Sequence, residues 1–386
     1  MAVASIARAF AERQHKLDEA QVRAFPQLLI AKQTRMLASP HAFFRGSAPL
    51  FYAILKERKL AEDLVGPVAW LVGDMHVENI GAFRTDDNEV VFDLNDFDEA
   101  AEAPVSVDVV RLLTSVILSG RAISSTSSEM IAHAQLTLDH YEHGAFAGAA
   151  EAREPPVVAK LRKVVADRSI DKYLDQRCPK HGGVRKFARG EKYIDLTPAL
   201  SAQVPKLLAD YIAALGERAP AGAHKWEIED SAERIAGTGS LGCVRFAIVA
   251  NDHVLDLKQA NPSSVNLSGV CKPSKLDPGE RVVTCAQKMV EKPPRHLAAL
   301  PPRKGLSLIG RRLSPQEDKL DLLSVSANEL GDVLAYVAHR LASGHRRSVG
   351  GRLEKWPKGL PKVLLDHAVE LAGLFEAISL HYAATV

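Results

Sequence analysis

The amino-acid sequence predicts an α+β fold. Short apolar runs bounded by turn residues, which are typical of buried strands, gather in residues 69–99 and 226–312. Much of the remaining chain places apolar side chains three and four residues apart, as amphipathic helices do. Strands and helices segregated along the chain in this way indicate the α+β class.

The composition is that of a globular protein with enough apolar material for two or more lobes. The chain has 386 residues, of which 46% are hydrophobic and 25% are charged. Its 49 basic and 47 acidic residues leave a net charge of +2, which gives no global field for nucleic acid or a membrane. We therefore expect no nucleic-acid and no membrane partner, and any anion site must be local.

The cysteines and the N-terminus bear on the compartment. The four cysteines lie far apart and form no CxxC pair, which argues against a zinc knuckle and against a disulfide framework. The N-terminal segment has no apolar signal core, and no run approaches the roughly 18 apolar residues that span a bilayer. These features predict a soluble, cytoplasmic protein.

Helices are expected before the first strand. Residues 4–36 fit one or two amphipathic helices with a break near Pro26, a further helix starts at Ser39, and another covers 48–58. Arg45 lies between the last two. We expect it to form a structural salt bridge, and contact with a phosphate is the alternative.

The stretch 69–99 organises the rest of the chain. It predicts a strand at 69–72 and a second at 90–92, with a hairpin turn at Asp86-Asp87-Asn88 between them. Polar residues that follow the strands would then meet at one sheet edge, where carboxylate and amide oxygens suit Mg²⁺. Capping of strands and turns is the alternative role. The residues concerned are Asp74, His76, Asn79, Asp93 and Asp96.

A buried helix and a charged region come next. The near-continuous apolar run after Pro104 predicts a helix buried on most faces, with Asp108 as a buried hydrogen-bond acceptor. An amphipathic helix is expected from about 126 to 150. Residues 151–225 form a charged region in which Gly182-Gly183 predicts a solvated hairpin or loop, with a substrate-docking surface as the alternative.

A glycine hairpin is predicted after residue 226. The pattern reads as strand, glycine turn, strand, turn and strand, ending at Lys258. A dinucleotide-binding fold would require a helix directly after the glycines, and the β-type run CVRFAIV stands there instead. Protein kinases use such a hairpin to close backbone amides over phosphates, and a strand lysine to hold the α and β oxygens. The candidate nucleotide-binding residues are Gly237, Thr238, Gly239, Ser240, Gly242 and Lys258.

Helices dominate the last part of the chain. A helix is expected at 279–292, where Glu280 or Glu291 can pair with Lys258, although both also fit a charged surface. A loop is then expected at 293–304, a short strand at 305–310 and helices at 326–342 and 362–382. Capping of a helix end is expected for His345, Arg346 and Arg347, with phosphate contact as the alternative.

Several motifs resemble known families. The segments Gly73-Asp74-Met75-His76-Val77-Glu78-Asn79 and Asp96-Phe97-Asp98-Glu99-Ala100 resemble the catalytic and metal motifs of the aminoglycoside and choline kinase branch of kinase-like phosphotransferases. The segments FFRG, VGDMHVENIGAFRT, FDLNDFDEA, DVVRL, LKQA and LASGHRRS more closely resemble the bacterial domain of unknown function 2252 family. That resemblance covers nearly the full length.

The kinase resemblance implies roles for the polar residues. Asp74 would orient the acceptor hydroxyl, with His76 bracing the catalytic loop through hydrogen bonds. Asn79 would be a metal ligand and Asp96 the main Mg²⁺ aspartate, with Asp93 as its competitor because it ends the strand and lies nearer to Asn79. The glycine hairpin and Lys258 would hold ATP.

The resemblance also implies a protein-kinase-like two-lobed fold with circularly permuted lobe order. Ordinary kinases place the glycine loop before the catalytic loop, and here it comes later. The expected parts are a helical catalytic lobe (1–225), a β-rich nucleotide-binding lobe (226–312) and helices that return to the catalytic lobe (313–386).

These observations lead to a hypothesis of function. We expect an ATP- and Mg²⁺-dependent phosphotransferase that acts on a hydroxyl of a small molecule or protein. AMP transfer in the same site and a nucleotide-binding module without turnover are alternatives. A third is a metallophosphoesterase that begins at Gly73-Asp74-Met75-His76. The acceptor and the oligomeric state stay open.

Overall fold

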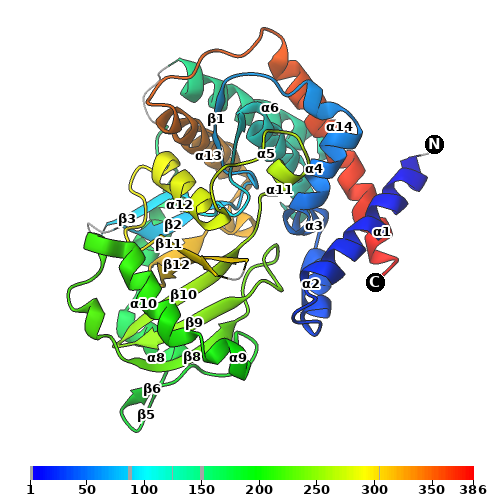
Figure 1. Cartoon of the computed structure of the whole chain (residues 1–386). Helices are drawn as coiled ribbons and strands as arrows, with labels where there is room; N and C mark the ends of the chain where they lie inside the picture. The colour runs from blue at the N-terminus through cyan, green and yellow to red at the C-terminus, as the bar shows by residue number, and fades with distance from the viewer. Residues whose placement is uncertain (1–2, 86–88, 124, 148–151, 304) are drawn as a thin grey trace.

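The computed structural model describes residues 3–85, 89–123, 125–147, 152–303 and 305–386. It shows a mixed α+β architecture, which confirms the predicted class. In Figure 1 a six-stranded sheet and its helices form one part of the molecule, and a mainly helical part that contains both chain ends lies beside it. Within the described ranges, none of the helices combines the length and apolar character needed to cross a bilayer.

The chain begins with helices, as expected. Helix α2 starts two residues after Pro26, and Ser39 caps α3 because its Oγ accepts a hydrogen bond from the amide of Ala42 at 3.0 Å. Proline at the first position of α3 supports the same start. The four helices are α1 (Val3–Gln21), α2 (Leu28–Met36), α3 (Pro40–Gly46) and α4 (Ala48–Glu57).

The strands of the central stretch pair differently from the prediction. The predicted strands correspond to β1 and β3, but β1 pairs with β4 and β3 pairs with β2, all antiparallel. The expected common sheet edge is therefore wrong. The short run that forms β2 was missed because it follows a polar loop directly. The bounds are β1 (Val68–Leu71), β2 (Ile80–Arg84), β3 (Val90–Leu94) and β4 (Ala101–Pro104).

A late strand completes the sheet of β2 and β3. Strand β13 (Glu317–Lys319) pairs with β2 on the side opposite β3, so that Lys319 lies across from Gly81. A side chain at Gly81 would meet the backbone oxygen of Asp318 at 2.5 Å, which explains the glycine. The turn predicted at Asp86-Asp87-Asn88 lies outside the described residues.

Long helices surround these strands. Helix α5 is buried along nearly its whole length, as predicted, and Tyr382 near the chain end donates a hydrogen bond to Asp18 of α1 at 2.6 Å. Helix α13 runs beyond the predicted end at 342, because Gly344 allows close packing against Leu94 instead of ending the helix. The helices are α5 (Ser106–Ser119), α6 (Ser127–Phe146), α12 (Pro278–Met289), α13 (Ala327–Ser348) and α14 (Leu360–Ala383).

The charged region 151–225 has more structure than predicted. The hairpin at Gly182-Gly183 is confirmed, with φ values of +61° and +88°, and it projects from the molecule in Figure 1. Helices and a short edge strand were missed because their apolar faces are interrupted by charges. The elements are α7 (Pro156–Ala166), α8 (Ile170–Arg177), β5 (Lys180–His181), β6 (Val184–Arg185), β7 (Tyr193–Ile194), α9 (Pro198–Ser201) and α10 (Val204–Leu215).

The six-stranded sheet contains the predicted glycine hairpin. Strands β8, β9 and β10 are antiparallel neighbours, and a two-residue turn with positive φ at Asn251 and Asp252 joins the last two. The loop predicted at 293–304 is wrong in part, because its residues 298–303 form β11. The strand order is β11-β12-β10-β9-β8-β7. The bounds are β8 (Ile228–Arg234), β9 (Arg245–Ala250), β10 (His253–Ala260), β11 (Ala298–Arg303) and β12 (Leu306–Arg312).

The two faces of this sheet differ. Leu255 and Leu257 belong to the apolar cluster that includes residues of α10, and Val254 belongs to a second cluster that includes Leu174 of α8. Because side chains alternate along a strand, Asp256 and Lys258 share the face of Val254. That face carries the charged groups considered next.

Candidate functional site

Asp74 lies in a sharp turn directly after β1. Its Oδ1 accepts a hydrogen bond from Nε of Arg111 at 2.8 Å. The Arg111 guanidinium is fully buried and lies over the rings of Phe44 and Phe51, at 4.3 Å and 4.6 Å from their centroids. Burial raises the pKa of Asp74, and the charge of Arg111 opposes that rise. The pair holds the carboxylate in one position.

The turn before Asp74 is held by a buried chain of polar groups. Asp108 accepts hydrogen bonds from the amides of Val72 at 2.7 Å and Gly73 at 2.9 Å, so its expected role as a buried acceptor is confirmed. His345 Nε2 lies 3.2 Å from Asp108, and its Nδ1 lies 2.8 Å from the hydroxyl of Tyr141. Segments far apart in sequence thus position the turn.

The residues at 345–347 do not follow a helix end as expected but lie in the last turn of α13, and the two arginines donate to last-turn carbonyls of α6 and α12. Helix α13 continues to Ser348, so these side chains point to neighbouring elements. Arg346 donates to the carbonyl of Gly144 at 3.1 Å, and Arg347 donates to the carbonyl of Met289 at 2.7 Å.

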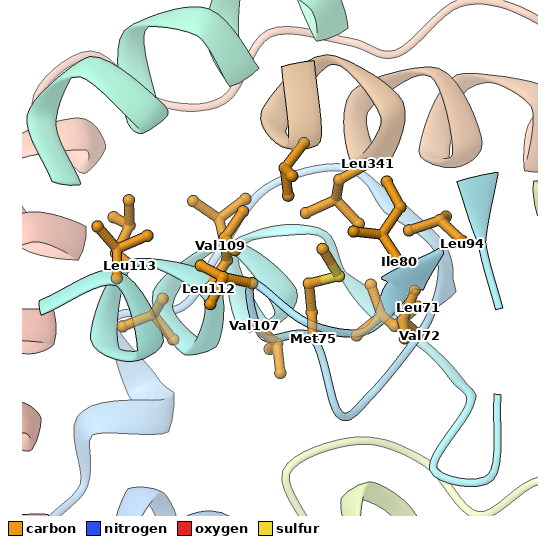
Figure 2. Close-up of a cluster of buried hydrophobic side chains, with 14 of the residues drawn as sticks. Leu71, Val72, Met75, Ile80, Leu94, Val107, Val109, Leu112, Leu113 and Leu341 are labelled. Atoms are coloured by element: carbon orange, nitrogen blue, oxygen red, sulfur yellow. The ribbon is translucent and has the colours of Figure 1, made fainter. Parts of the chain in front are cut away.

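Apolar packing fixes the loop between β1 and β2. Figure 2 shows side chains of this loop and the flanking strands meeting those of α5 and α13. The polar residues of the loop therefore stand on a rigid base. The labelled side chains are Leu71, Val72, Met75, Ile80, Leu94, Val107, Val109, Leu112, Leu113 and Leu341.

Asn79 joins two segments that belong to different sheets. Its Nδ2 donates to the carbonyl oxygens of Asp74 at 3.0 Å and Asp96 at 3.2 Å. Its Oδ1 is buried and has no hydrogen-bond partner. An unpartnered amide oxygen is a suitable ligand for a hard cation, and an unsatisfied buried acceptor is costly. Asn79 Oδ1 is therefore an oxygen that a hard cation can use as a ligand.

Asp96 is surrounded by cationic side chains. Burial raises the pKa of Asp96, but the charges of Lys258, Lys319 and Arg311 outweigh this effect and hold the pKa below its usual range. The carboxylate is thus ionised at neutral pH, as a metal ligand must be.

Lys258 forms an ion pair with Asp98, two residues beyond Asp96. Lys258 therefore does not pair with Glu280 or Glu291, and both glutamates are exposed, as the alternative of a charged surface predicts. Glu291 lies 3.3 Å from Arg340 instead, and Lys258 extends from the face of the sheet that meets the segment after β3.

Asp93 has a different environment. Its Oδ1 accepts a hydrogen bond from the amide of Leu94 at 2.9 Å, and its Oδ2 accepts one from the amide of Glu291 at 3.3 Å. Arg347 lies 3.4 Å from the same carboxylate, and burial raises the pKa of Asp93. These contacts do not bring Asp93 together with Asn79.

His76 is buried in the same loop. Its Nδ1 accepts a hydrogen bond from the amide of Glu78 at 3.2 Å. Burial lowers the pKa of His76 well below its usual value, and the charges of Arg45 and Lys319 add to this effect. A neutral ring that accepts a backbone hydrogen bond is suited to bracing the loop.

The glycine loop between β8 and β9 lies against the N-terminal helices. Side chains of Arg35 and Gln21 donate to the carbonyls of Gly237 and Gly239. Gly242 has φ +93°, and a side chain there would meet the backbone of Gln21 at 2.5 Å. Thr238 and Ser240 belong to the same loop, within which Ser240 Oγ lies 3.4 Å from the carbonyl of Ala236.

Arg45 connects this loop to the catalytic-loop candidates. Its backbone oxygen lies 3.7 Å from the position that a Cβ on Gly239 would take. Its side chain forms an ion pair with Glu78, which confirms the expected salt bridge.

Sequence reasoning missed three other groups. Lys319 on β13 lies within electrostatic range of Asp96, Glu78 and Asp74. Arg281 of α12 is buried and donates to the carbonyl of Asp98 at 2.8 Å. No local signal marks Lys319, whereas an arginine on the apolar face of α12 was a detectable signal.

Glu99 is the third missed group. Its carboxylate accepts hydrogen bonds from the amide and the hydroxyl of Ser264, the latter at 3.1 Å. Burial raises the pKa of Glu99 to about 7, and the hydrogen bond from Ser264 opposes the rise.

A cavity of about 430 Å³ is lined in part by the two sequence neighbours of Asp96. Asn95, Phe97 and Arg311 line it together with Tyr173 and Val254, and Asn95 Oδ1 is buried without a hydrogen-bond partner. The lining is mixed, because charged side chains such as Arg84 and Glu317 stand among the apolar ones. Across the described ranges, no three His, Cys, Asp or Glu side chains are grouped as a metal site would require.

Fold and site together define a mixed α+β protein with a cluster of charged groups between a β-sheet and a helical part. The chain belongs to the DUF2252 family, described as uncharacterized proteins conserved in bacteria, whose model matches residues 23–384. No curated protein and no solved structure matches it.

Proposed function

We propose that this protein is an ATP- and Mg²⁺-dependent phosphotransferase that acts on a hydroxyl group. The observation that carries the proposal is the meeting of two distant parts of the chain. Lys258, on the second strand after the glycine loop, is paired with Asp98, and Asn79 bridges the backbone of Asp74 and Asp96.

The order of elements supports this proposal. A glycine loop between two antiparallel strands, a third strand with a lysine and then a helix is the arrangement that protein kinases use for ATP. Asp74 and Asn79 have the spacing of the aspartate and asparagine in the kinase catalytic loop. On this proposal the lobe order is permuted, with the nucleotide lobe following the catalytic loop.

One feature departs from the kinase pattern. In kinases the strand lysine pairs with a glutamate of the following helix, whereas here Asp98 pairs with Lys258. Helix α12 instead contributes Arg281, which holds the carbonyl oxygens of Asp98 and Ala100. Helix α12 thus positions Asp98, and it affects Lys258 through Asp98.

Each residue has a role in the proposed reaction. The acceptor oxygen forms a bond to the γ-phosphorus, the bond from that phosphorus to the bridging oxygen breaks, and ADP leaves with the electron pair. Asp74, held by Arg111, orients the acceptor hydroxyl and accepts its proton directly or through water. Lys258 and the amides near Gly239 hold the donor phosphates.

Mg²⁺ held by Asn79 and Asp96 would supply neutralising charge at the β and γ oxygens. Positioning and electrostatics account for most of the catalysis that such a transfer requires. A two-metal phosphoesterase would need further nitrogen or carboxylate ligands, and none are grouped in this way in the described part of the chain.

Thermal-shift titration with ATP and Mg²⁺ tests the proposal. A ligand at a hundred times its Kd stabilises the native state by about 2.7 kcal/mol. We expect the wild type to respond, Lys258→Ala to lose the response, and Lys275→Ala, at an exposed site after α11 (Ser264–Leu267), to keep it.

Turnover is measured on the same proteins. We expect slow release of γ-phosphate to water that is lost in Asp74→Asn. Binding without turnover would support the nucleotide-binding module, and release of pyrophosphate would support AMP transfer. A wild type that gives no response to ATP contradicts the proposal.

A further inference from the structure

Several carboxylates around Asp74 already have basic partners. Asp74 is paired with Arg111 and Glu78 with Arg45. Asp98, two residues beyond Asp96, is paired with Lys258. Three of the acidic groups near the proposed transfer point therefore already have basic partners.

The aromatic rings nearest Asp74 are also occupied. Cationic ligands such as quaternary ammonium groups are commonly held against aromatic faces. Here the faces of Phe44 and Phe51 are covered by the guanidinium of Arg111, which is fully buried between them. A cationic acceptor would have to displace Arg111 from both rings and from Asp74.

Hydrogen-bond donors, in contrast, are left over. Nε of Arg45 and Nη1 of Arg111 are buried, and neither finds a hydrogen-bond partner in the part of the chain that the structure describes. A guanidinium nitrogen can only donate, so each lacks an acceptor. Buried donors in this state favour a ligand that supplies oxygen atoms.

Lys319 adds an available positive charge. Pairing of β13 with β2 places it opposite Gly81, two residues after Asn79. Its side chain is exposed, it lies within electrostatic range of Asp74, Asp96 and Arg45, and it makes no ion pair within the described ranges of the chain. An anion beside Asp74 would be attracted by both Lys319 and Arg45.

We propose that the acceptor carries an anionic group, a phosphate or a carboxylate, beside the hydroxyl that receives the phosphoryl group, and that Arg45 and Lys319 bind it. This inference rests on the proposed phosphotransferase function. It separates the protein from kinases of choline and aminoglycosides, whose acceptors are cations.

The same cations can also contact the γ-phosphate of the donor, so the experiment must separate the two sources of anion. Inorganic phosphate is titrated calorimetrically at low ionic strength into the full-length protein saturated with Mg²⁺ and a non-hydrolysable ATP analogue, which fills the γ position. A parallel titration uses Mg²⁺ and ADP, which leave that position empty. Choline is the cationic probe in both.

We expect phosphate to bind with the γ position filled and choline not to bind. Lys319→Gln should raise the phosphate Kd about tenfold, because one charge-assisted contact is lost. Arg45→Gln should raise the phosphate Kd in the same way. If loss of the ion pair of Arg45 impairs folding of that variant, Lys319→Gln still tests the inference. Lys362→Gln, at an exposed site on α14, should leave the Kd unchanged.

The other outcomes count against the inference. If phosphate binds only in the presence of ADP, Arg45 and Lys319 belong to the donor site. Saturable binding of choline would overturn an anionic acceptor. Absence of phosphate binding would overturn it as well. Failure of the proposed function looks different, since neither nucleotide would then stabilise the protein.

Discussion

Lys258 and Asp98 form an ion pair although 160 positions separate them in the sequence. The lysine side chain is 11% exposed and the carboxylate 33% exposed, so the pair stands at the edge of solvent. Attraction at such a site is screened less than on an open surface. In the proposed reaction Lys258 exchanges Asp98 for phosphate oxygens, which is a local change of partner and requires no rearrangement of the sheet.

Asn79 provides a test of the junction between the two segments. Asn79→Asp replaces an amide donor with an oxygen facing the carbonyls of Asp74 and Asp96, so two hydrogen bonds are lost and repulsion is added. We expect the free energy of unfolding to fall by at least about 2 kcal/mol in urea titrations. Asn251→Asp is the matched control, because Asn251 only accepts a hydrogen bond there and Asp can do the same. Equal effects at both sites would contradict this account.

Two glycines with nearly the same positive φ separate backbone strain from close contact. Gly73 has φ +79° and Gly222 has φ +78°. The methyl group of Gly222→Ala would meet no atom within 4 Å. This variant should lower the free energy of unfolding by about 1–2 kcal/mol, which is the cost of the left-handed conformation alone. Gly73→Ala should cost clearly more, because the new methyl group overlaps the backbone oxygen of Glu99. Urea denaturation measures both, and similar costs would show that the turn at Gly73 can relax.

Two histidine–aspartate pairs of similar length differ in burial. His345 lies 3.2 Å from Asp108 with both side chains fully buried, whereas His367 lies 3.1 Å from Asp63, which is 58% exposed. His345→Leu should lower the free energy of unfolding by about 1–3 kcal/mol, because Asp108 loses a buried partner. His367→Leu should change it by less than about 1 kcal/mol. Thermal or urea unfolding of the two variants decides the point.

Glu99 predicts a pH dependence of stability. Its pKa is raised from 4.5 to about 7, so the folded protein binds this proton more tightly than the unfolded chain does. The contribution of Glu99 is therefore full below pH 4.5 and is lost as the pH rises towards 7. Glu99→Gln should remove this loss, so that its free energy of unfolding falls less between pH 5 and pH 7 than that of the wild type. If the urea midpoints of the wild type and of Glu99→Gln keep a constant difference across this range, the raised pKa of Glu99 is contradicted.

Local pattern was sufficient for many elements of the fold. The break near Pro26, the capped start of α3, the buried helix α5 and the hairpin from β8 to β10 all follow from residues within one or two turns of each other. Such elements depend on apolar spacing, caps and turn residues, which a sequence displays directly. Strand β2 was missed because it directly follows a polar loop, and β4 and β13 were missed because they contain too few apolar residues to show a strand pattern.

The sequence by itself determined the α+β class, the family and the residue types of the candidate site. Only the tertiary structure decided which strands pair, that Asp98 is the partner of Lys258, and that Lys319 comes to lie beside Asp74 and Asp96. These relationships join segments far apart along the chain. Their free energy comes from burial, strand pairing and charge contacts that exist once the whole chain has closed, and no local run of residues records them.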